Sequence, residues 1–171
     1  MFDSSYNFRY CNSSKIKKGQ YDVREHVLTF NCNLGLRYIV KVEEYYHSLY
    51  AIKFYLKIHA NSKRKFNLIT GNQTPLPVIG TCIEIMKYFI AKNPFASFAF
   101  IGSNSVNENR ENTKRFRIYK QLMENIFSPL NFKHLSFLRE SAYILINKDN
   151  SEPNLLPLYE NMFREIYLVE L

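Results

Sequence analysis

What this chain has little of already narrows the classes of protein to which it can belong. Its 171 residues include no Trp, five Gly and three Cys. So few glycines argue against a collagen-like or linker-rich chain. The cysteines Cys11, Cys32 and Cys82 are odd in number and widely spaced, with no C-x-x-C. A secreted disulfide scaffold, a zinc ribbon and a thioredoxin-like site are therefore disfavoured, and small buried or partly buried thiols are expected.

Long apolar runs are also missing. The longest, at residues 97–101 and 143–146, are far too short to span a bilayer. Residues 1–6 show no basic segment followed by an apolar run, which is the pattern of a secretory signal. The sequence therefore predicts a cytoplasmic protein with no membrane partner.

The composition favours one folded domain with a basic surface. Hydrophobic residues make up 46% of the chain and aromatic residues 16%. A chain of this size and composition can bury a substantial core, so we expect a single domain over residues 1–171. The 23 basic residues outnumber the 15 acidic ones, for a net charge of +8. This balance favours anionic partners, namely nucleic acid, phosphorylated cofactors or anionic lipid.

The first half of the chain has the period of β-strands. Residues 1–26 are polar and mixed, so a less regular N-terminal segment is expected there. Strands are predicted over residues 27–34 and 36–46, where Tyr38, Val40 and Val42 alternate with charged residues. Residues 49–59 continue the alternation after a turn at His47, and residues 66–70 read as another short strand. Together these strands predict an antiparallel meander.

The second half alternates between helix and strand. Apolar residues at steps of three and four predict helices over residues 78–91 and 110–127. A strand is predicted at residues 97–101, a strand or hairpin at 132–147, and a C-terminal helix at 153–171. The whole order predicts an α+β fold, with a mostly antiparallel twisted sheet covered by helices.

Two family resemblances follow from these segments. The first is carried by Phe98-Ala-Phe-Ile-Gly-Ser, by Asn112-Thr-Lys-Arg-Phe-Arg-Ile-Tyr and by Ser141-Ala-Tyr-Ile-Leu-Ile-Asn-Lys. Over residues 95–150 this succession resembles a family of small uncharacterised bacterial proteins. That resemblance supports an intact domain and implies no particular activity.

The second resemblance is to the GNAT-type acetyltransferases, whose strand and helix order is similar from residue 66 onward. In that family a loop of pattern [QR]-x-x-G-x-[GA] cradles the CoA pyrophosphate with backbone N–H groups at a helix N-terminus. Gly80 matches the last small position, while Pro75 and Val78 stand where the pattern has an amide or basic residue and a glycine. The resemblance implies that Gly80 and Thr81 meet the phosphates of acetyl-CoA or another acyl-CoA.

The same resemblance implies an acyltransferase that has become catalytically degenerate or has stayed active. The GNAT pattern N-x-x-[AS]-x-x-[LF]-Y is matched at Asn112 and Tyr119, with Arg115 in place of the small residue. Asn112 would face the pantetheine arm, and Tyr119 would be the general acid to the leaving thiolate. Core packing is the competing interpretation of Tyr119, because it lies on the apolar stripe of its helix.

A nucleic-acid-binding module is the alternative function. Along the second helix, Arg110, Lys114 and Arg117 align on one side with Lys120 nearby. Such a ridge could follow phosphates, or it could be an ordinary solvated helix face. The aromatic and basic residues of the meander could likewise stack bases, although packing in a sheet accounts for them equally well.

The remaining expectations concern partners and chemistry. The C-terminal helix should dock on the domain or on a partner, and a homodimer is one such arrangement. None of the four histidines has a metal-ligand spacing, so no metal site is expected. Glu43 and Glu44 are adjacent and should point to opposite faces of their strand. Either one could be a general base on the meander.

Overall fold

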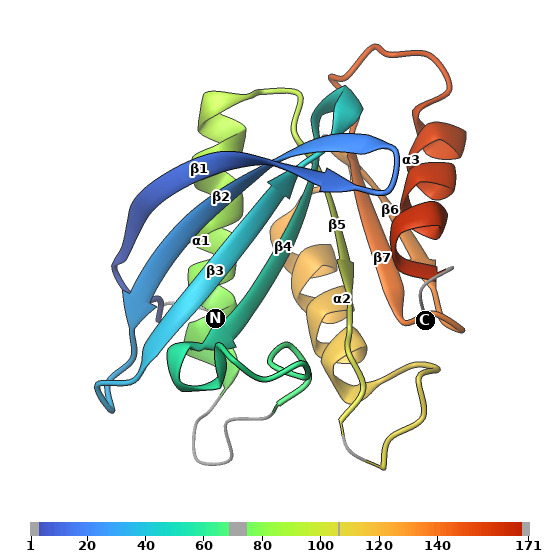
Figure 1. Cartoon of the computed structure of the whole chain (residues 1–171). Helices are drawn as coiled ribbons and strands as arrows, with labels where there is room; N and C mark the ends of the chain where they lie inside the picture. Colours follow the sequence, from blue (N-terminus) through green and yellow to red (C-terminus); the bar gives the residue numbers. More distant parts are fainter. Residues whose placement is uncertain (1–3, 69–74, 106, 169–171) are drawn as a thin grey trace.

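In the computed structural model, residues 4–68, 75–105 and 107–168 are described. They form an α+β fold with a seven-stranded sheet in the order β1-β2-β3-β4-β5-β7-β6 (Figure 1). The strands are β1 (Phe8–Lys18), β2 (Tyr21–Asn31), β3 (Arg37–Glu44), β4 (Leu49–Leu56), β5 (Ser97–Ile101), β6 (Phe132–Phe137) and β7 (Ala142–Asn147). Neighbouring strands are antiparallel except β4 and β5, which are parallel. The predicted fold class, a mostly antiparallel sheet with helices, is confirmed at this level.

Helices cover the two faces of the sheet unequally. Helices α1 (Pro75–Lys92) and α2 (Lys114–Ile126) lie behind the sheet in Figure 1, and α3 (Leu155–Phe163) lies in front of it. Each face has its own cluster of buried apolar side chains. A short π-helical segment, Arg164–Leu168, follows α3. Within the described residues, no helix has both the length and the apolar character that crossing a bilayer requires.

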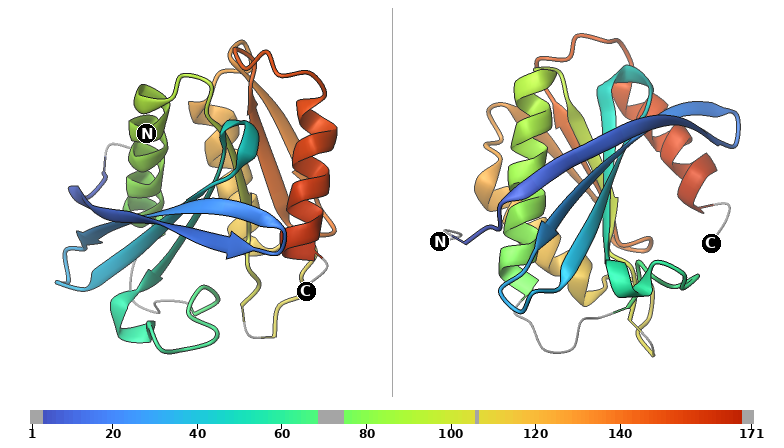
Figure 2. Two further views of the ribbon diagram at one scale, coloured as in Figure 1. Left: turned by 45° about the horizontal axis from the view of Figure 1, so that its top comes forward. Right: turned by 60° about the vertical axis from the view of Figure 1, so that its left-hand side comes forward.

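The N-terminal segment is more regular than the sequence indicates. Residues 8–31 form a long hairpin of β1 and β2, joined by a turn at Gly19 with φ of 57°. Most of β1 is exposed because it is the edge strand, so it lacks the alternating apolar pattern on which strand prediction depends. Both views in Figure 2 show the hairpin tip reaching toward α3. There Tyr21 Oη and Gln20 Nε2 each donate to Glu165 Oε2 at 2.7 Å.

The meander has the predicted alternation, and it separates two sets of side chains. On the α1 side lie Tyr38, Val40 and Val42 of β3. On the α3 side, β4 contributes Leu49 and Ala51. The aromatic residues of the meander are divided in the same way, since Tyr50 belongs to the first cluster and Tyr45 to the second. Tyr45 and Tyr50 are buried and Tyr46 is exposed, so these side chains do not form one exposed aromatic face.

Two predicted boundaries are wrong. Residues 66 and 67 are in a turn and residue 68 has no regular secondary structure, so no strand forms there, and the rest of the predicted strand, 69–70, lies outside the described residues. Helix α2 begins at Lys114 instead of Arg110, because Thr113 is its N-cap and accepts from the Phe116 backbone N–H at 3.2 Å. The preceding Asn112 has φ of 50°, which ends the irregular loop. The strand at 97–101 and the hairpin within 132–147 are confirmed.

Candidate functional site

The sheet opens where its only parallel pair of described strands diverges. Strands β4 and β5 pair at Leu49–Ser97, Tyr50–Phe98 and Ala51–Ala99, and no further. Beyond Ala51, β4 runs on to Leu56, and beyond Ala99, β5 runs on to Ile101. Their other edges remain paired with β3 and β7. The two strands therefore face each other across a gap with unpaired backbone edges.

A cavity of about 510 Å³ occupies this gap. Its apolar walls include Ile52 and Phe54 of β4, which point to the α1 side, together with Ile79 and Met86 of α1. Its lining also includes Ala51 of β4 and Ala99 of β5, with Phe163 of α3, all from the other face. Because adjacent residues of a strand point to opposite faces, the cavity passes between the strands from one face of the sheet to the other.

Tyr119 lies in the wall of this cavity, on α2. Its ring packs edge-on against Phe100 of β5, with ring centroids 5.1 Å apart. Burial of the hydroxyl raises the pKa of Tyr119 well above its usual value, and Cys82 raises it further while Arg115 opposes the shift. The hydroxyl is therefore protonated at neutral pH and can donate a proton or a hydrogen bond to a group in the cavity. Tyr119 therefore both packs on the apolar stripe of α2 and faces the cavity.

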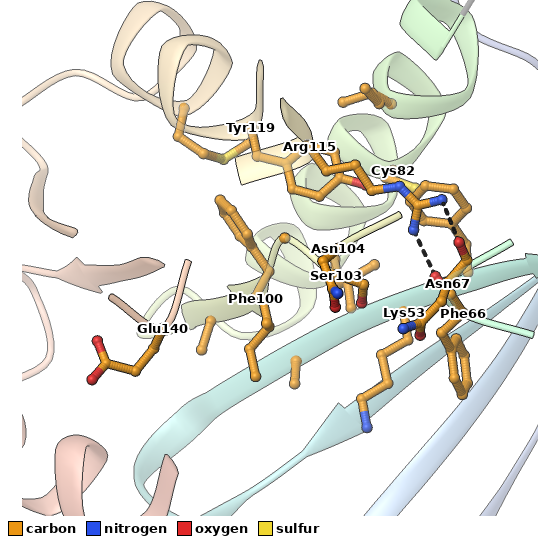
Figure 3. A pocket seen from close by; sticks show the side chains of 18 of the residues that line it. Lys53, Phe66, Asn67, Cys82, Phe100, Ser103, Asn104, Arg115, Tyr119 and Glu140 are labelled. Atoms are coloured by element: carbon orange, nitrogen blue, oxygen red, sulfur yellow. Dashed lines mark hydrogen bonds between the residues drawn. The ribbon is translucent and has the colours of Figure 1, made fainter. Parts of the chain in front are cut away.

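Arg115 holds the loop beside the cavity mouth. Its guanidinium donates to the backbone carbonyls of Phe66 at 2.7 Å, Leu68 at 3.2 Å and Asn67 at 3.3 Å. Figure 3 shows Arg115 reaching from α2 to this loop, close to Tyr119. Sequence reasoning found Arg115 only as a departure from a family pattern. No sequence signal identifies its acceptors, because they are backbone atoms of a distant loop.

The predicted cofactor-binding residues lie apart from the cavity. Gly80 lies inside α1 against the N-terminal segment, where an added Cβ would meet the Ser4 carbonyl oxygen at 2.6 Å. The Thr81 side chain is fully buried, and its hydroxyl donates to the Pro77 carbonyl while accepting from the Tyr6 N–H. Asn112 is exposed, and its carbonyl accepts from Arg117. The geometry does not bring these three residues to Tyr119, so their cofactor role stays a prediction that depends on the family resemblance.

The predicted basic ridge is partly engaged within the protein. Arg117 donates to the Asn112 carbonyl, and Lys120 pairs with Glu124 at 2.6 Å. Lys114 is exposed in the first turn of α2. Arg110 lies before the helix and lines the cavity, so the structure separates it from the helical ridge and places it at the candidate site.

A buried charge cluster lies beside the cavity on the α3 side. The Glu43 side chain is 2% exposed, and its carboxylate lies 3.0 Å from Lys18 Nζ and 3.0 Å from Lys53 Nζ. The Tyr45 hydroxyl also donates to this carboxylate. The predicted opposition of Glu43 and Glu44 is confirmed, because Glu44 accepts from His26 Nε2 on the other face at 2.8 Å.

Lys53 joins this cluster to the cavity, since it also lines the cavity wall. Burial lowers the pKa of Lys53 to about 8, while the Glu43 carboxylate opposes that shift. The sequence marks Lys53 only as one basic residue of an alternating strand. Its pairing with Glu43 depends on the β3–β4 register, and the contribution of Lys18 depends on the hairpin, neither of which a strand pattern specifies.

Among the described residues, no group of three or more His, Cys, Asp or Glu side chains is arranged to hold a metal ion. Comparison with protein-family models, with curated proteins and with solved structures finds no match to this chain.

Proposed function

We propose that the cavity between β4 and β5 binds the acyl-pantetheine arm of an acyl-CoA and that the protein is acyltransferase-like. The observation that carries this proposal is the short β4–β5 pairing, which ends at Ala51–Ala99 and leaves two strand edges facing a cavity. An extended ligand with its own amide groups can pair with such an edge as an added strand would. Pantetheine is an extended chain with two amides, so it suits this gap.

The size and lining of the cavity support the same ligand class. A volume of about 510 Å³ lies within the range of small-molecule sites. Much of the cavity lining is apolar, with Ile83 and Met123 among its residues. The exposed Arg110 and Arg139 lie at its edge, where cationic side chains would attract the phosphates of CoA. Tyr119 would then donate a hydrogen bond or a proton to the thioester sulfur.

The resemblance to GNAT-type acetyltransferases agrees with this proposal in one respect and departs from it in another. The succession of strands and helices is similar. However, the pyrophosphate-loop pattern is incomplete, and Gly80 and Thr81 are occupied by contacts within the protein. We therefore assign the phosphates to the arginines at the cavity edge and leave the loop out of the proposed site.

Calorimetric titration with a series of fragments tests the proposal. We expect acetyl-CoA and CoA to bind, and pantetheine to bind more weakly because it lacks the phosphates. Added salt should weaken CoA binding and leave pantetheine binding almost unchanged, because only the phosphate contacts are screened. Binding by ADP alone with none by pantetheine would contradict the assignment of the cavity to the pantetheine arm.

A pair of cavity variants locates the binding. Cys82 lines the cavity from α1, and burial raises the pKa of its thiol to about 12, so it behaves as a small apolar group. Cys82→Phe should fill the cavity and lower the affinity for acetyl-CoA at least about tenfold, the equivalent of about 1.4 kcal/mol. Cys82→Ser keeps the volume and should bind normally. If Cys82→Phe does not fold, Ser103→Trp at the cavity edge provides the same test.

A further inference from the structure

The cavity lining contains four side chains with an amine, a thiol or a hydroxyl, namely Lys53, Cys82, Ser103 and Tyr119, and these groups differ in how readily they react. Burial raises the pKa values of the Cys82 thiol and the Tyr119 hydroxyl, so both are protonated at neutral pH. A serine hydroxyl is a weak nucleophile until a neighbouring base removes its proton. Lys53 differs from all three, because burial lowers the pKa of its amine and so favours the neutral, nucleophilic form.

The Lys53 amine also lies where a thioester bound in the cavity can reach it. Its side chain is 21% exposed, so the amine is shielded without being sealed off. It projects to the α3 side of the sheet, away from Tyr119, as Figure 3 shows. The cavity passes between the strands and connects the two sides, because residues of both faces line it. A thioester carbonyl that crosses the gap from the Tyr119 side would therefore approach the Lys53 amine.

Glu43 places a proton acceptor beside the Lys53 amine. Its carboxylate contacts Lys53 Nζ at 3.0 Å and can receive a proton from it. Two other lysines lie near this point: Lys18, which contacts the same carboxylate, and Lys41, which lies directly opposite Lys53 across β3 and β4. Lys41 donates to Glu25 at 2.7 Å, so it turns toward β2 and does not share Glu43.

We propose that Lys53 is an acyl acceptor, whose amine takes the acyl group from a thioester held in the cavity. This inference rests on the proposed function. In the reaction the nitrogen lone pair attacks the thioester carbonyl, and a C–N bond forms. The C–S bond then breaks, and sulfur leaves with the bonding electrons as a thiolate. The proton lost from nitrogen passes through the Glu43 carboxylate to solvent or to the thiolate, which gives an amide and a free thiol.

The modification would change the charge cluster in a defined way. An acylated Lys53 is neutral, so Glu43 would retain Lys18 and the Tyr45 hydroxyl as its partners. The new acyl group would lie in the gap and occupy part of the space that the pantetheine arm fills. Acylation should therefore also weaken a second round of acyl-CoA binding.

The test is incubation of the whole protein with acetyl-CoA, followed by intact-mass measurement and peptide mapping. We expect one acetyl group per chain, on Lys53, at a rate that rises through about pH 8. Lys53→Arg should remain unmodified. Lys41→Arg is the matched control, because it removes an amine from the same face and the same register, and it should be acetylated on Lys53 as the unaltered protein is.

Two further measurements separate this inference from the proposed function. Calorimetry with CoA, which carries no acyl group, reports on cavity binding alone. Treatment with acetyl N-hydroxysuccinimide ester at about pH 8 reports on amine reactivity alone, and Lys53 should react on the order of tenfold faster than an ordinary lysine. Binding of CoA without acetylation of Lys53 by acetyl-CoA would overturn the inference and leave the proposed function standing. Absence of CoA binding would overturn both, and equal reactivity of Lys53 and Lys41 toward the ester would contradict the activated amine directly.

Discussion

At the residue scale, the buried Glu43 and the partly buried Lys53 form an ion pair at the wall of a cavity. Burying an ionised group costs free energy unless the group is paired. Here the Glu43 carboxylate contacts two ammonium groups and accepts a hydrogen bond from a hydroxyl. Burial affects Lys53 more than its partner compensates, so its pKa falls from 10.5 to about 8. The pKa of the Lys53 amine therefore lies closer to neutral pH than that of an ordinary lysine.

This pKa predicts how stability depends on pH. Between about pH 8 and 10.5 the unfolded chain keeps a proton on Lys53 that the folded chain has released, so the folded state becomes more stable as pH rises through this window. From pH 7 to about pH 9.5 the gain should be about 2 kcal/mol. Urea unfolding of the protein and of Lys53→Met across this range measures it as a difference between the two. Parallel curves for both proteins would contradict the assigned pKa.

The sequence predicts the orientation of Glu43 but not its burial or its partners. The opposite facing of Glu43 and Glu44 follows from the two-residue period of a strand, and it is confirmed. The burial of Glu43 does not follow, because a Glu in a meander strand is usually solvated. Its partner Lys18 comes from a segment predicted to be less regular, so the cluster becomes visible only once β1 is paired with β2.

At the scale of elements, the junction between β5 and α2 sets one edge of the cavity. The Thr113 hydroxyl donates to the Gly102 carbonyl at 2.6 Å while capping α2. The Thr113 backbone N–H donates to the Ser141 hydroxyl at 2.9 Å. Gly102 also permits close approach, because an added Cβ would lie 2.4 Å from the Phe116 backbone nitrogen. The start of α2 is therefore fixed against the end of β5 by contacts that need a glycine.

Gly102→Ala should therefore destabilise the protein and widen the junction. A methyl group at 2.4 Å from backbone atoms forces a shift of α2 or of the β5 end, with a cost of about 1–3 kcal/mol. Thermal or urea unfolding measures this loss. Ser103→Ala is the matched control in the same loop and should change stability little. An unchanged free energy of unfolding in Gly102→Ala would show that the junction accommodates a side chain at this position, which would contradict the tight packing of Gly102 against Phe116.

Elements with strong periodicity could be predicted, and those without it could not. Helix α1 is recognisable because its apolar residues repeat at the helical period, and β5 because it is a short, almost wholly apolar run. The edge strand β1 was missed because pairing with β2, and not burial, holds it. The Arg110 boundary was placed too early because Thr113, a common N-cap residue, lies inside a run of polar residues where periodicity gives no boundary.

At the scale of the whole molecule, α3 packs against the sheet of its own domain. Its buried Leu155, Tyr159, Met162 and Phe163 belong to the core cluster of the front face, and the Tyr159 hydroxyl donates to the His47 carbonyl. The predicted docking of this helix on the domain is confirmed. Homodimer formation stays a prediction, and the apolar stripe of α3 is already used within the chain.

The gap between β4 and β5 could not be predicted from the sequence. The α+β class follows from the order of strands and helices, but the point at which two parallel neighbours stop pairing has no signature in their hydrophobic patterns. Tyr119 was singled out from a family pattern, and the structure places it at this gap. Lys53 and Arg115 were brought there by register and by loop contacts, for which a single sequence carries no signal.

The proposed function requires an acyl-CoA to lie along the unpaired edges of β4 and β5. Amide hydrogen exchange with and without saturating acetyl-CoA measures this directly, because amides that gain a hydrogen-bond partner exchange more slowly. We predict slower exchange within residues 52–56 and 100–104, with smaller changes in the distant β1–β2 hairpin. Unchanged exchange in both stretches, or protection confined to the basic residues of α2, would contradict binding of the acyl-CoA in this gap.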